Sequence, residues 1–464
     1  MKFNFTLLAE LSPKFKRNPD VLEYKVPKPY IETQKILNNV NPFIIGAGPA
    51  GLFAALALVE NGFQPYIFER GDKIENRMKD VQKFWNSGIL NEESNVQFGE
   101  GGAGAFSDGK LTSRTRDFYT GRIYKYLIKF GAPKEIEFEA LPHLGTDELR
   151  KIIKNIRTYL ESKGCRFFWK HKLTDIFVAD EKVFKVKINC EIYRPEILIL
   201  AVGNAARDTF KMLSSKTELS NKPFAVGVRI EHLQDFVNSA FYGEKTDFSI
   251  TGPATYRLTA KHKNRGVYSF CMCPGGYVIA ASSEKNLQVL NGMSFRKRDN
   301  KFANSALVVT VNEKDFGNKP LAGVKYQRQI EKIFFNEKKP YFASIQSAKD
   351  FLQHKISSEY LETSYLPGTV RTDLNNLLPD PIADSLKFAL KMFDRKISGF
   401  TGNGILLAPE TRTSSPIRIN RNKFDFSAVK IKNLFPIGEG AGYAGGIISS
   451  ATDGFKVGKL FKLK

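Results

Sequence analysis

The feature that most constrains the fold is a glycine turn that joins a short apolar strand to a helix. The turn Gly46-x-Gly48-x-x-Gly51 follows the apolar residues 43–45 and opens an apolar run that predicts a helix over 52–61. Another apolar strand comes next. A strand, a glycine turn, a helix and a strand in this order form a βαβ unit. We therefore expect an α/β protein built on a parallel sheet.

The three glycines and a later acidic residue match the fingerprint of a dinucleotide-binding fold. The first glycine permits the tight turn, the second lets a pyrophosphate approach the backbone, and the third lets helix and strand pack closely. The helix N-terminus then offers N–H groups and a positive dipole end to the phosphates. Glu69 ends the next strand, 65–69, and a carboxylate there can bind both hydroxyls of an adenosine ribose. The alternative is a glycine turn that arose by chance.

A second glycine turn near the end of the chain favours FAD over NAD. Residues 437–442 carry Glu439 among glycines and lead into a helix expected to start near Gly446. In two-dinucleotide-fold flavoproteins a similar turn supplies an acid to the ribityl chain, and the helix N-terminus faces the flavin pyrimidine ring. Glu439 is the expected ribityl ligand, although Asp is commoner there, and a turn that only packs is the alternative. Ala201-Val202-Gly203 resembles the strand-end turn beside the cofactor in such proteins.

Beyond these motifs, the chain resembles the family of FAD-dependent dehydrogenases that is also described as NAD(FAD)-utilising dehydrogenases. The matching stretches are 46–55, 101–111, 143–147, 201–210, 222–232, 270–276, 304–309, 410–416 and the turn at Gly438. The resemblance implies an FAD-binding sheet assembled from both ends of the chain, with a second domain inserted between them. Relatives usually carry a fuller N-terminal module, which here is shortened to about forty residues.

The sequence thus predicts a discontinuous, Rossmann-like FAD-binding domain over 41–210 and 400–464. An inserted α+β substrate or cap domain is expected over 211–399, with alternating, hairpin-like pieces such as 268–281, and a short leader or appendage over 1–40. The cofactor-binding residues are expected in the glycine turns, in the glycine-rich loop 99–109 and beside them: Gly46, Gly48, Pro49, Ala50, Gly51, Glu69, Arg70, Gly102, Ala103, Gly104, Ser107, Asp108, Gly203, Gly438, Glu439, Gly446 and Ile447.

The catalytic residues stay open, and the candidates for them are weak. Cys271-x-Cys273 could place a thiol against the flavin as nucleophile or relay, or could simply pack a strand. Arg412 could hold an anionic substrate group, or could form a buried ion pair in a turn. His143 is a possible proton donor, and so is His232, but a lone histidine is more often a hydrogen-bonded core residue. No metal site is expected.

Composition narrows the class of protein further. A chain of 464 residues is longer than a single hydrophobic core usually allows, so more than one domain is expected. Four cysteines are too few for a disulfide framework and fit a reducing compartment. Residues 43–59 carry no charge, but their glycines argue against a membrane helix. We expect a cytoplasmic protein, with a plastid or another organelle as the alternative. The net charge of +22 would favour anionic partners, yet its basic clusters are short and scattered, so nucleic acid is not the expected partner.

These observations predict an FAD-dependent oxidoreductase that passes hydride or electrons through the flavin to an unidentified small-molecule substrate. Residues 211–400 contain no second Gly-x-Gly-x-x-Gly between a strand and a helix, so the electron donor is expected to be a visiting NAD(P)H or a ferredoxin-like protein. A flavin monooxygenase is the second enzyme hypothesis. A flavin-containing RNA-binding or RNA-modifying protein is the alternative from another class, and the positive charge motivates it.

Overall fold

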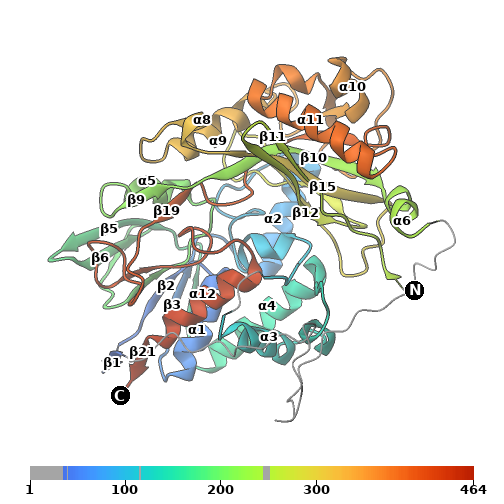
Figure 1. Cartoon of the computed structure of the whole chain (residues 1–464). Helices are drawn as coiled ribbons and strands as arrows, with labels where there is room; N and C mark the ends of the chain where they lie inside the picture. Colours follow the sequence, from blue (N-terminus) through green and yellow to red (C-terminus); the bar gives the residue numbers. More distant parts are fainter. Residues whose placement is uncertain (1–34, 39, 114–116, 244–250) are drawn as a thin grey trace, which may run out of the picture.

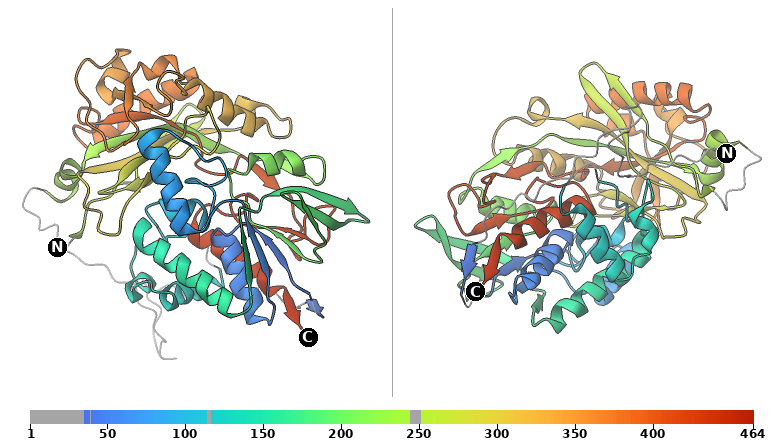
Figure 2. Two further views of the ribbon diagram at one scale, coloured as in Figure 1. Left: turned by 180° about the vertical axis from the view of Figure 1, so that it is seen from behind. Right: turned by 60° about the horizontal axis from the view of Figure 1, so that its bottom comes forward.

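A computed structural model of the chain describes residues 35–38, 40–113, 117–243 and 251–464. Most of the expected leader, residues 1–34 and 39, lies outside the described residues. The described part contains a five-stranded parallel sheet, a seven-stranded mixed sheet and four smaller sheets, and helices lie against them (Figures 1 and 2). It is a mixed α/β structure, as expected.

The parallel sheet is assembled from both halves of the chain. Its strands are, in spatial order, β20 (Leu434–Pro436), β8 (Leu198–Leu200), β2 (Phe43–Ile45), β3 (Tyr66–Glu69) and β4 (Arg166–Trp169). The strand β20, from near the end of the chain, therefore pairs with β8. Every residue of β2 and β8 is buried, as expected for parallel strands that are covered on both faces.

Different elements cover the two faces, because side chains alternate along each strand. Ile44, Ile67 and Ile199 lie in the apolar core shared with the helices α1 (Pro49–Glu60), α4 (Gly145–Ser162) and α12 (Ile447–Lys459). Their neighbours Phe43, Phe68 and Leu198 lie in a separate core with a three-stranded antiparallel sheet. That sheet consists of β5 (Leu173–Ala179), β6 (Lys182–Ile188) and β7 (Glu191–Tyr193). Helices, parallel sheet and antiparallel sheet thus form three layers.

The backbones of the helices α1 and α12 lie very close together, and the residues of α12 at the contact are glycines. A Cβ on Gly454 would lie 1.9 Å from the carbonyl oxygen of Ala50, and one on Gly458 would lie 2.6 Å from that of Ala54. No side chain fits at such distances. The contact fixes the helix from the end of the chain against the helix that follows the first glycine turn.

The segment between the two halves forms a seven-stranded mixed sheet. Its strands are, in spatial order, β11 (Thr259–His262), β12 (Arg265–Cys273), β15 (Phe302–Val311), β10 (Phe224–Leu233), β18 (Ile405–Glu410), β16 (Ala343–Ser347) and β17 (Thr369–Arg371). Only β16 and β17 pair in parallel. The helix α11 (Asp380–Lys396) packs its apolar side into the core of this sheet, and β18 belongs to it although it follows residue 400, where we placed the domain boundary.

The predicted hairpin over 268–281 is wrong. The strands β12 and β13 (Tyr277–Ala280) flank the turn but do not pair, since β12 pairs with β11 and β15, whereas β13 pairs with β14 (Leu290–Met293). The amide of Gly276 donates to the carbonyl of Phe302 instead of closing a hairpin. The turn therefore carries the chain from one sheet into another.

The start and the end of the described chain lie side by side. The strand β1 (Lys35–Leu37), part of the expected leader, pairs in parallel with β21 (Phe461–Leu463). A second small sheet joins β9 (Leu219–Asn221) to β19 (Ile417–Ile419). The remaining helices are α2 (Ile74–Ser87), α3 (Thr120–Lys129), α5 (Arg207–Leu213), α6 (Gln234–Tyr242), α8 (Glu313–Phe316), α9 (Ala322–Ile333) and α10 (Ala348–Gln353), with 3₁₀ turns η1 (Gly102–Phe106), η2 (Lys134–Glu137) and η3 (Leu374–Asn376).

Candidate functional site

The first glycine turn has the geometry that its motif predicts. A Cβ on Gly46, whose φ is +108°, would lie 2.3 Å from the carbonyl oxygen of Ala201, and one on Gly51 would lie 1.9 Å from that of Gly46. These two glycines are required by packing. Gly48 differs, because a Cβ there would meet only the backbone of Gly102, whose Cα and N would lie at 3.7 and 3.9 Å. The protein leaves room at Gly48, which is the position where the fingerprint brings a pyrophosphate to the backbone.

The glycine-rich loop lies against both glycine turns. Gly102 lies beside Gly48, and a Cβ on Gly104 would contact the side chain of Ile447, the first residue of α12, at 3.3 Å. Ala103, between them, is exposed. The predicted residues of the loop and of both turns are therefore brought together at one place.

The loop is held from behind by a buried arginine that we did not anticipate from the sequence. Arg77 in α2 is fully buried, and its guanidinium donates to the carbonyls of Asn95, Val96, Gly99 and Glu100. These bonds satisfy four backbone acceptors that no strand pairs. Nothing in the spacing of Arg77 distinguishes it from a solvent-exposed helical arginine.

Glu69 holds the backbone of this site together. One carboxylate oxygen accepts from the amide of Ala47 at 2.8 Å, and the other accepts from the amides of Gly71 and Gly99, each at 2.9 Å. The side chain is only 5% exposed. Glu69 therefore ties the first glycine turn to the glycine-rich loop, and its binding of ribose hydroxyls stays a prediction.

The second glycine turn packs onto the first helix, as the predicted two-ended site requires. A Cβ on Gly438 would lie 2.7 Å from that of Ala50, and one on Gly440 would lie 2.4 Å from the carbonyl oxygen of Gly203. Glu439 accepts a hydrogen bond from Nδ2 of Asn204 at 2.7 Å. Burial raises the pKa of the Glu439 carboxyl to about 7, against the opposing effects of Asn204 and of a nearby lysine.

The room left by the glycines fits a dinucleotide. A Cβ on Gly203, Gly445 or Gly446 would have no atom within 4 Å, and Gly48 meets only another glycine. Gly203 belongs to the strand-end turn, Gly446 is the N-cap of α12, and Gly48 is the N-cap of α1. Two helix N-termini thus border the same open backbone, an arrangement suited to a ligand with phosphates.

Three other predicted ligands have protein partners instead. Asp108 is 1% exposed and accepts from Ser294, Arg298 and Lys110, so it joins the loop to the central segment. Arg70 pairs with Asp208 at 2.5 Å and lies over the ring of Phe98. Ser107 donates from its hydroxyl to the carbonyl of Gly104 at 2.8 Å and accepts from the amide of Gly109. Asp108 and Arg70 therefore serve to assemble the site.

Of the catalytic candidates, the cysteine pair and His143 lie beside the loop, and His143 forms a β-bridge with Lys110, the residue after the loop. Lys110 Nζ donates to the carbonyl of Met272, between Cys271 and Cys273. Arg229 Nη2 donates to the carbonyl of Cys271 at 3.1 Å, and Nη1 of the same side chain pairs with Glu410 at 3.0 Å. Cys271 is half-buried and Cys273 is fully buried. Sequence reasoning missed Lys110, Arg229 and Glu410, although all three lie in stretches that carry the family resemblance.

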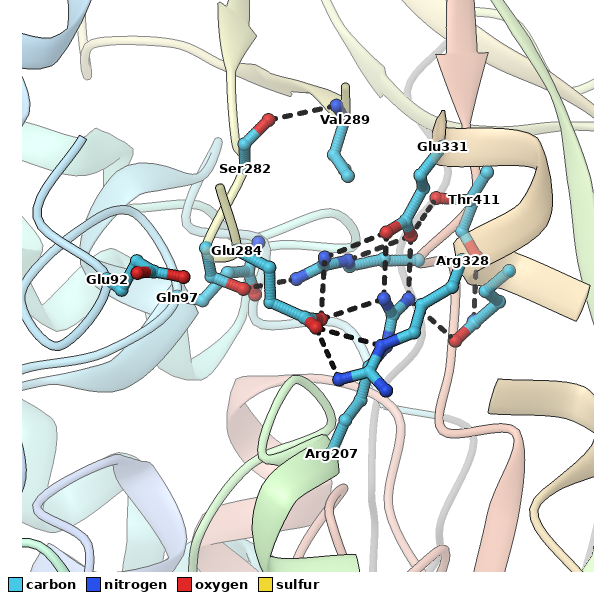
Figure 3. A network of polar contacts seen from close by, with 12 residues as sticks. Glu92, Gln97, Arg207, Ser282, Glu284, Val289, Arg328, Glu331 and Thr411 are labelled. Carbon is cyan, nitrogen blue, oxygen red and sulfur yellow. Dashed lines mark hydrogen bonds and ion pairs between the residues drawn. The ribbon is translucent and has the colours of Figure 1, made fainter. Parts of the chain in front are cut away.

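Arg412 is part of a buried ion-pair network, which is the alternative we had kept open for it. Its guanidinium contacts both carboxylate oxygens of Glu331 at 3.1 Å. Arg207 contacts the same carboxylate at 2.6 and 2.7 Å, and the hydroxyl of Thr411 donates to it as well (Figure 3). Glu331 lies on α9 and Arg207 on α5. The network therefore joins the central segment to the helix that follows β8, and the Arg412 guanidinium has protein partners within it.

The two histidines also have ordinary partners. His143 Nε2 lies 3.2 Å from the carbonyl oxygen of Arg296, and burial lowers its pKa. His232 is buried, its Nε2 lies 2.8 Å from the carbonyl oxygen of Phe400, and burial lowers its pKa to about 4. His232 is thus a hydrogen-bonded core residue.

Within the described ranges, no cluster of three or more His, Cys, Asp or Glu side chains is arranged to hold a metal ion. The same ranges contain no helix that is long and apolar enough to span a membrane.

Part of the chain matches a known protein family, and most of it matches a relative. Residues 223–413 match the family described as FAD-dependent protein, C-terminal domain-like. An uncharacterized protein of Clostridium beijerinckii is 46% identical over 424 residues, which is 90% of this chain and 79% of that protein.

Several solved flavoprotein structures show a remote likeness. CtdE in complex with FAD is 10% identical, with 90% of this chain and 82% of that chain covered and a TM-score of 0.35. The flavin-dependent brominase Bmp2 is 12% identical, with 90% of this chain and 77% of that chain covered and a TM-score of 0.39. Quinol fumarate reductase FrdA of E. coli is 13% identical, with 90% of this chain and 69% of that chain covered and a TM-score of 0.39. At TM-scores this low, the likeness says nothing further about this chain.

Proposed function

The chain belongs to one family with the Clostridium beijerinckii protein and carries the domain of FAD-dependent proteins, and from this premise we propose that it is an FAD-dependent oxidoreductase. It is a flavoprotein whose cofactor is FAD. The finer proposal is that the two ends of the chain form a Rossmann-like FAD site and that the inserted segment holds an unidentified small-molecule substrate.

One observation carries the proposal. Gly48 and Gly203 come from the first half of the chain and Gly446 from its end, yet all three follow the carboxyl ends of the neighbouring parallel strands β2, β8 and β20 and leave room beside the backbone. At Gly48, the N-cap of α1, neither packing nor the φ of −78° requires glycine, and a ligand that must touch the backbone explains it. Gly203 and Gly446 also have positive φ, of +76° and +155°, which by itself favours glycine.

Different residues of the chain would hold different parts of FAD. The turn at Gly48 and the N-terminus of α1 would hold the pyrophosphate, and Glu69 would reach the adenosine ribose. Glu439 would bind the ribityl hydroxyls. The N-terminus of α12 would lie toward the flavin pyrimidine ring, where its positive dipole end favours negative charge. When bound, FAD supplies two-electron redox chemistry.

The electron donor we propose is a visiting NAD(P)H or a small ferredoxin-like protein, since the central segment lacks a second dinucleotide fingerprint. The central segment forms the seven-stranded sheet instead, and the strands β10 and β15 of this sheet are buried almost throughout.

The test begins with the purified protein. We expect it to be yellow and to release FAD on denaturation. When it is mixed anaerobically with NADH, NADPH or reduced ferredoxin, each in a separate experiment, we expect one of the three to bleach the flavin absorbance. Recovery of FMN, or of NAD without flavin, would contradict the proposal. If reduced protein reacts rapidly with oxygen and hydroxylates a compound, the enzyme is a monooxygenase instead.

A further inference from the structure

The strand β12 contains a strained bulge at Cys271. Its pairing with β15 shifts register between Phe270 and Cys273, and Cys271 has a φ of +46°. Residues other than glycine, asparagine and aspartate seldom adopt this left-handed conformation, and such strain is concentrated at functional sites. Packing alone gives no reason for it, because an ordinary strand would bury both thiols equally well.

Two cations hold this bulge in place. Arg229 donates to the carbonyl of Cys271, and Lys110 donates to the carbonyl of Met272. The anions on the neighbouring elements are already paired: Asp108 binds Arg298 and Lys110, and Glu410 binds Arg229. Lys110 and Arg229 are the positive groups that lower the pKa of Cys271, and the carboxylate of Asp108 opposes them.

The two thiols are adjacent and differ in character. Sγ of Cys273 lies 3.3 Å from the carbonyl oxygen of Cys271. The neighbouring Cys273 thiol, together with Lys110 and Arg229, lowers the pKa of Cys271 to about 5, whereas the pKa of Cys273 is raised. A half-buried thiolate beside a buried, protonated thiol is the pairing that thiol–disulfide chemistry uses.

The glycine-rich loop links the thiols to the FAD site. Lys110 follows this loop directly, and the loop places Gly102 beside Gly48 and Gly104 beside Ile447. The loop therefore touches both glycine turns at one end and the cysteine bulge at the other.

We propose that Cys271 and Cys273 form a redox-active dithiol that exchanges two electrons with the bound FAD. The proposal rests on the proposed function. In forming one S–S bond, the Cys271 thiolate and the Cys273 thiol release two electrons and the single thiol proton, all of which oxidised FAD accepts. In the reverse direction the same electrons and proton, from reduced FAD, cleave the disulfide. The pair would thus carry electrons between the flavin and a reaction partner bound by the central segment.

The first test counts electrons in the FAD-loaded protein. Anaerobic titration of the oxidised protein with dithionite should consume four electrons per FAD, and Cys271→Ser or Cys273→Ser should consume two. The matched controls Cys165→Ser and Cys190→Ser change cysteines that are distant in the sequence from Cys271, and these variants should still consume four electrons per FAD. Peptide mass spectrometry should find a Cys271–Cys273 disulfide in the oxidised protein alone. Two electrons in the wild type and no such disulfide would overturn the proposal while leaving FAD binding intact.

The second test needs no electron transfer. Alkylation of Cys271 by iodoacetamide, followed by peptide mass spectrometry, should have its inflection below pH 7, whereas an ordinary thiol titrates at about 8.5. Lys110→Met should raise that inflection by at least one pH unit. An inflection near 8.5 in both proteins would overturn the assignment. A protein that releases no FAD would instead refute the proposed function, and the alkylation profile would still report on the thiols.

Discussion

At the scale of single residues, the glycines of the first turn separate ligand binding from packing. Gly48→Val should leave a folded protein without FAD, because a branched side chain there enters the space of the pyrophosphate and meets little protein. The matched change Gly51→Val should unfold the turn, since even its Cβ would lie 1.9 Å from the carbonyl oxygen of Gly46. FAD content and the free energy of unfolding measure the two effects. Full FAD content in Gly48→Val would remove this turn from the site.

Glu439 gives the cofactor affinity a dependence on pH. Its pKa is raised to about 7, and hydroxyl donors on the ribityl chain favour the ionised carboxylate, so FAD should bind more tightly as pH rises from 6 to 8. Glu439→Ala should weaken binding roughly ten- to hundredfold, the loss of about 1.5–3 kcal/mol for one charge-assisted hydrogen bond. The two-electron potential of molecules that keep FAD should stay nearly unchanged.

Dissociation constants measured across this pH range check the prediction, with Glu439→Gln as the control that keeps the shape but not the charge. Glu439→Gln should bind FAD with an affinity that no longer changes between pH 6 and 8. An unchanged affinity in Glu439→Ala would place the residue outside the site.

At the scale of elements, the contact between α1 and α12 depends on glycine. Gly454→Ala should lower the free energy of unfolding by about 1–3 kcal/mol or more, because the added Cβ overlaps the carbonyl oxygen of Ala50. Gly121→Ala in α3, where an added Cβ would have no atom within 4 Å, should raise the free energy of unfolding by about 0.5–1 kcal/mol. Denaturant unfolding of both variants measures the contrast, and equal effects would contradict it.

The elements also show which parts of the fold the sequence could reveal. The βαβ unit and both glycine turns were predictable, because their signals are local: an apolar run, glycines at fixed spacing and a helix. The hairpin over 268–281 was predicted wrongly, because two apolar runs around a turn do not determine their partners, and β12 and β13 find theirs in different sheets. Arg77 and Glu331 could not be recognised, because a buried charge with many partners has the same local sequence pattern as an exposed one.

At the scale of the whole molecule, the network around Glu331 joins the central segment to the parallel sheet. The two arginines beside it lower the pKa of Glu331 to about 2, so its contribution to stability is present above about pH 4.5 and is lost as the pH falls toward 2. Glu331→Gln should cost about 3–5 kcal/mol at pH 7, because it leaves the two buried arginines, Arg207 and Arg412, to share the carboxylate of Glu284.

The matched control is Arg328→Gln, which removes a half-exposed partner of Glu284 at the edge of the same network. It should change the free energy of unfolding by no more than about 1 kcal/mol. Denaturant unfolding at pH 7 compares the two variants. Equal, small losses would show that the network does not hold the two parts together.

The position of β20 beside β8 has a consequence for biosynthesis. Leu198–Leu200 leaves the ribosome long before Leu434–Pro436, and at about 5–20 residues per second the edge of β8 stays without its neighbour for roughly ten to fifty seconds. Until then α1 also lacks α12. The nascent chain therefore has to keep an apolar strand edge from pairing with other chains during that interval. Chains stalled before residue 434 should be cut by protease within 41–210 and captured by chaperones, whereas released full-length chains should resist both.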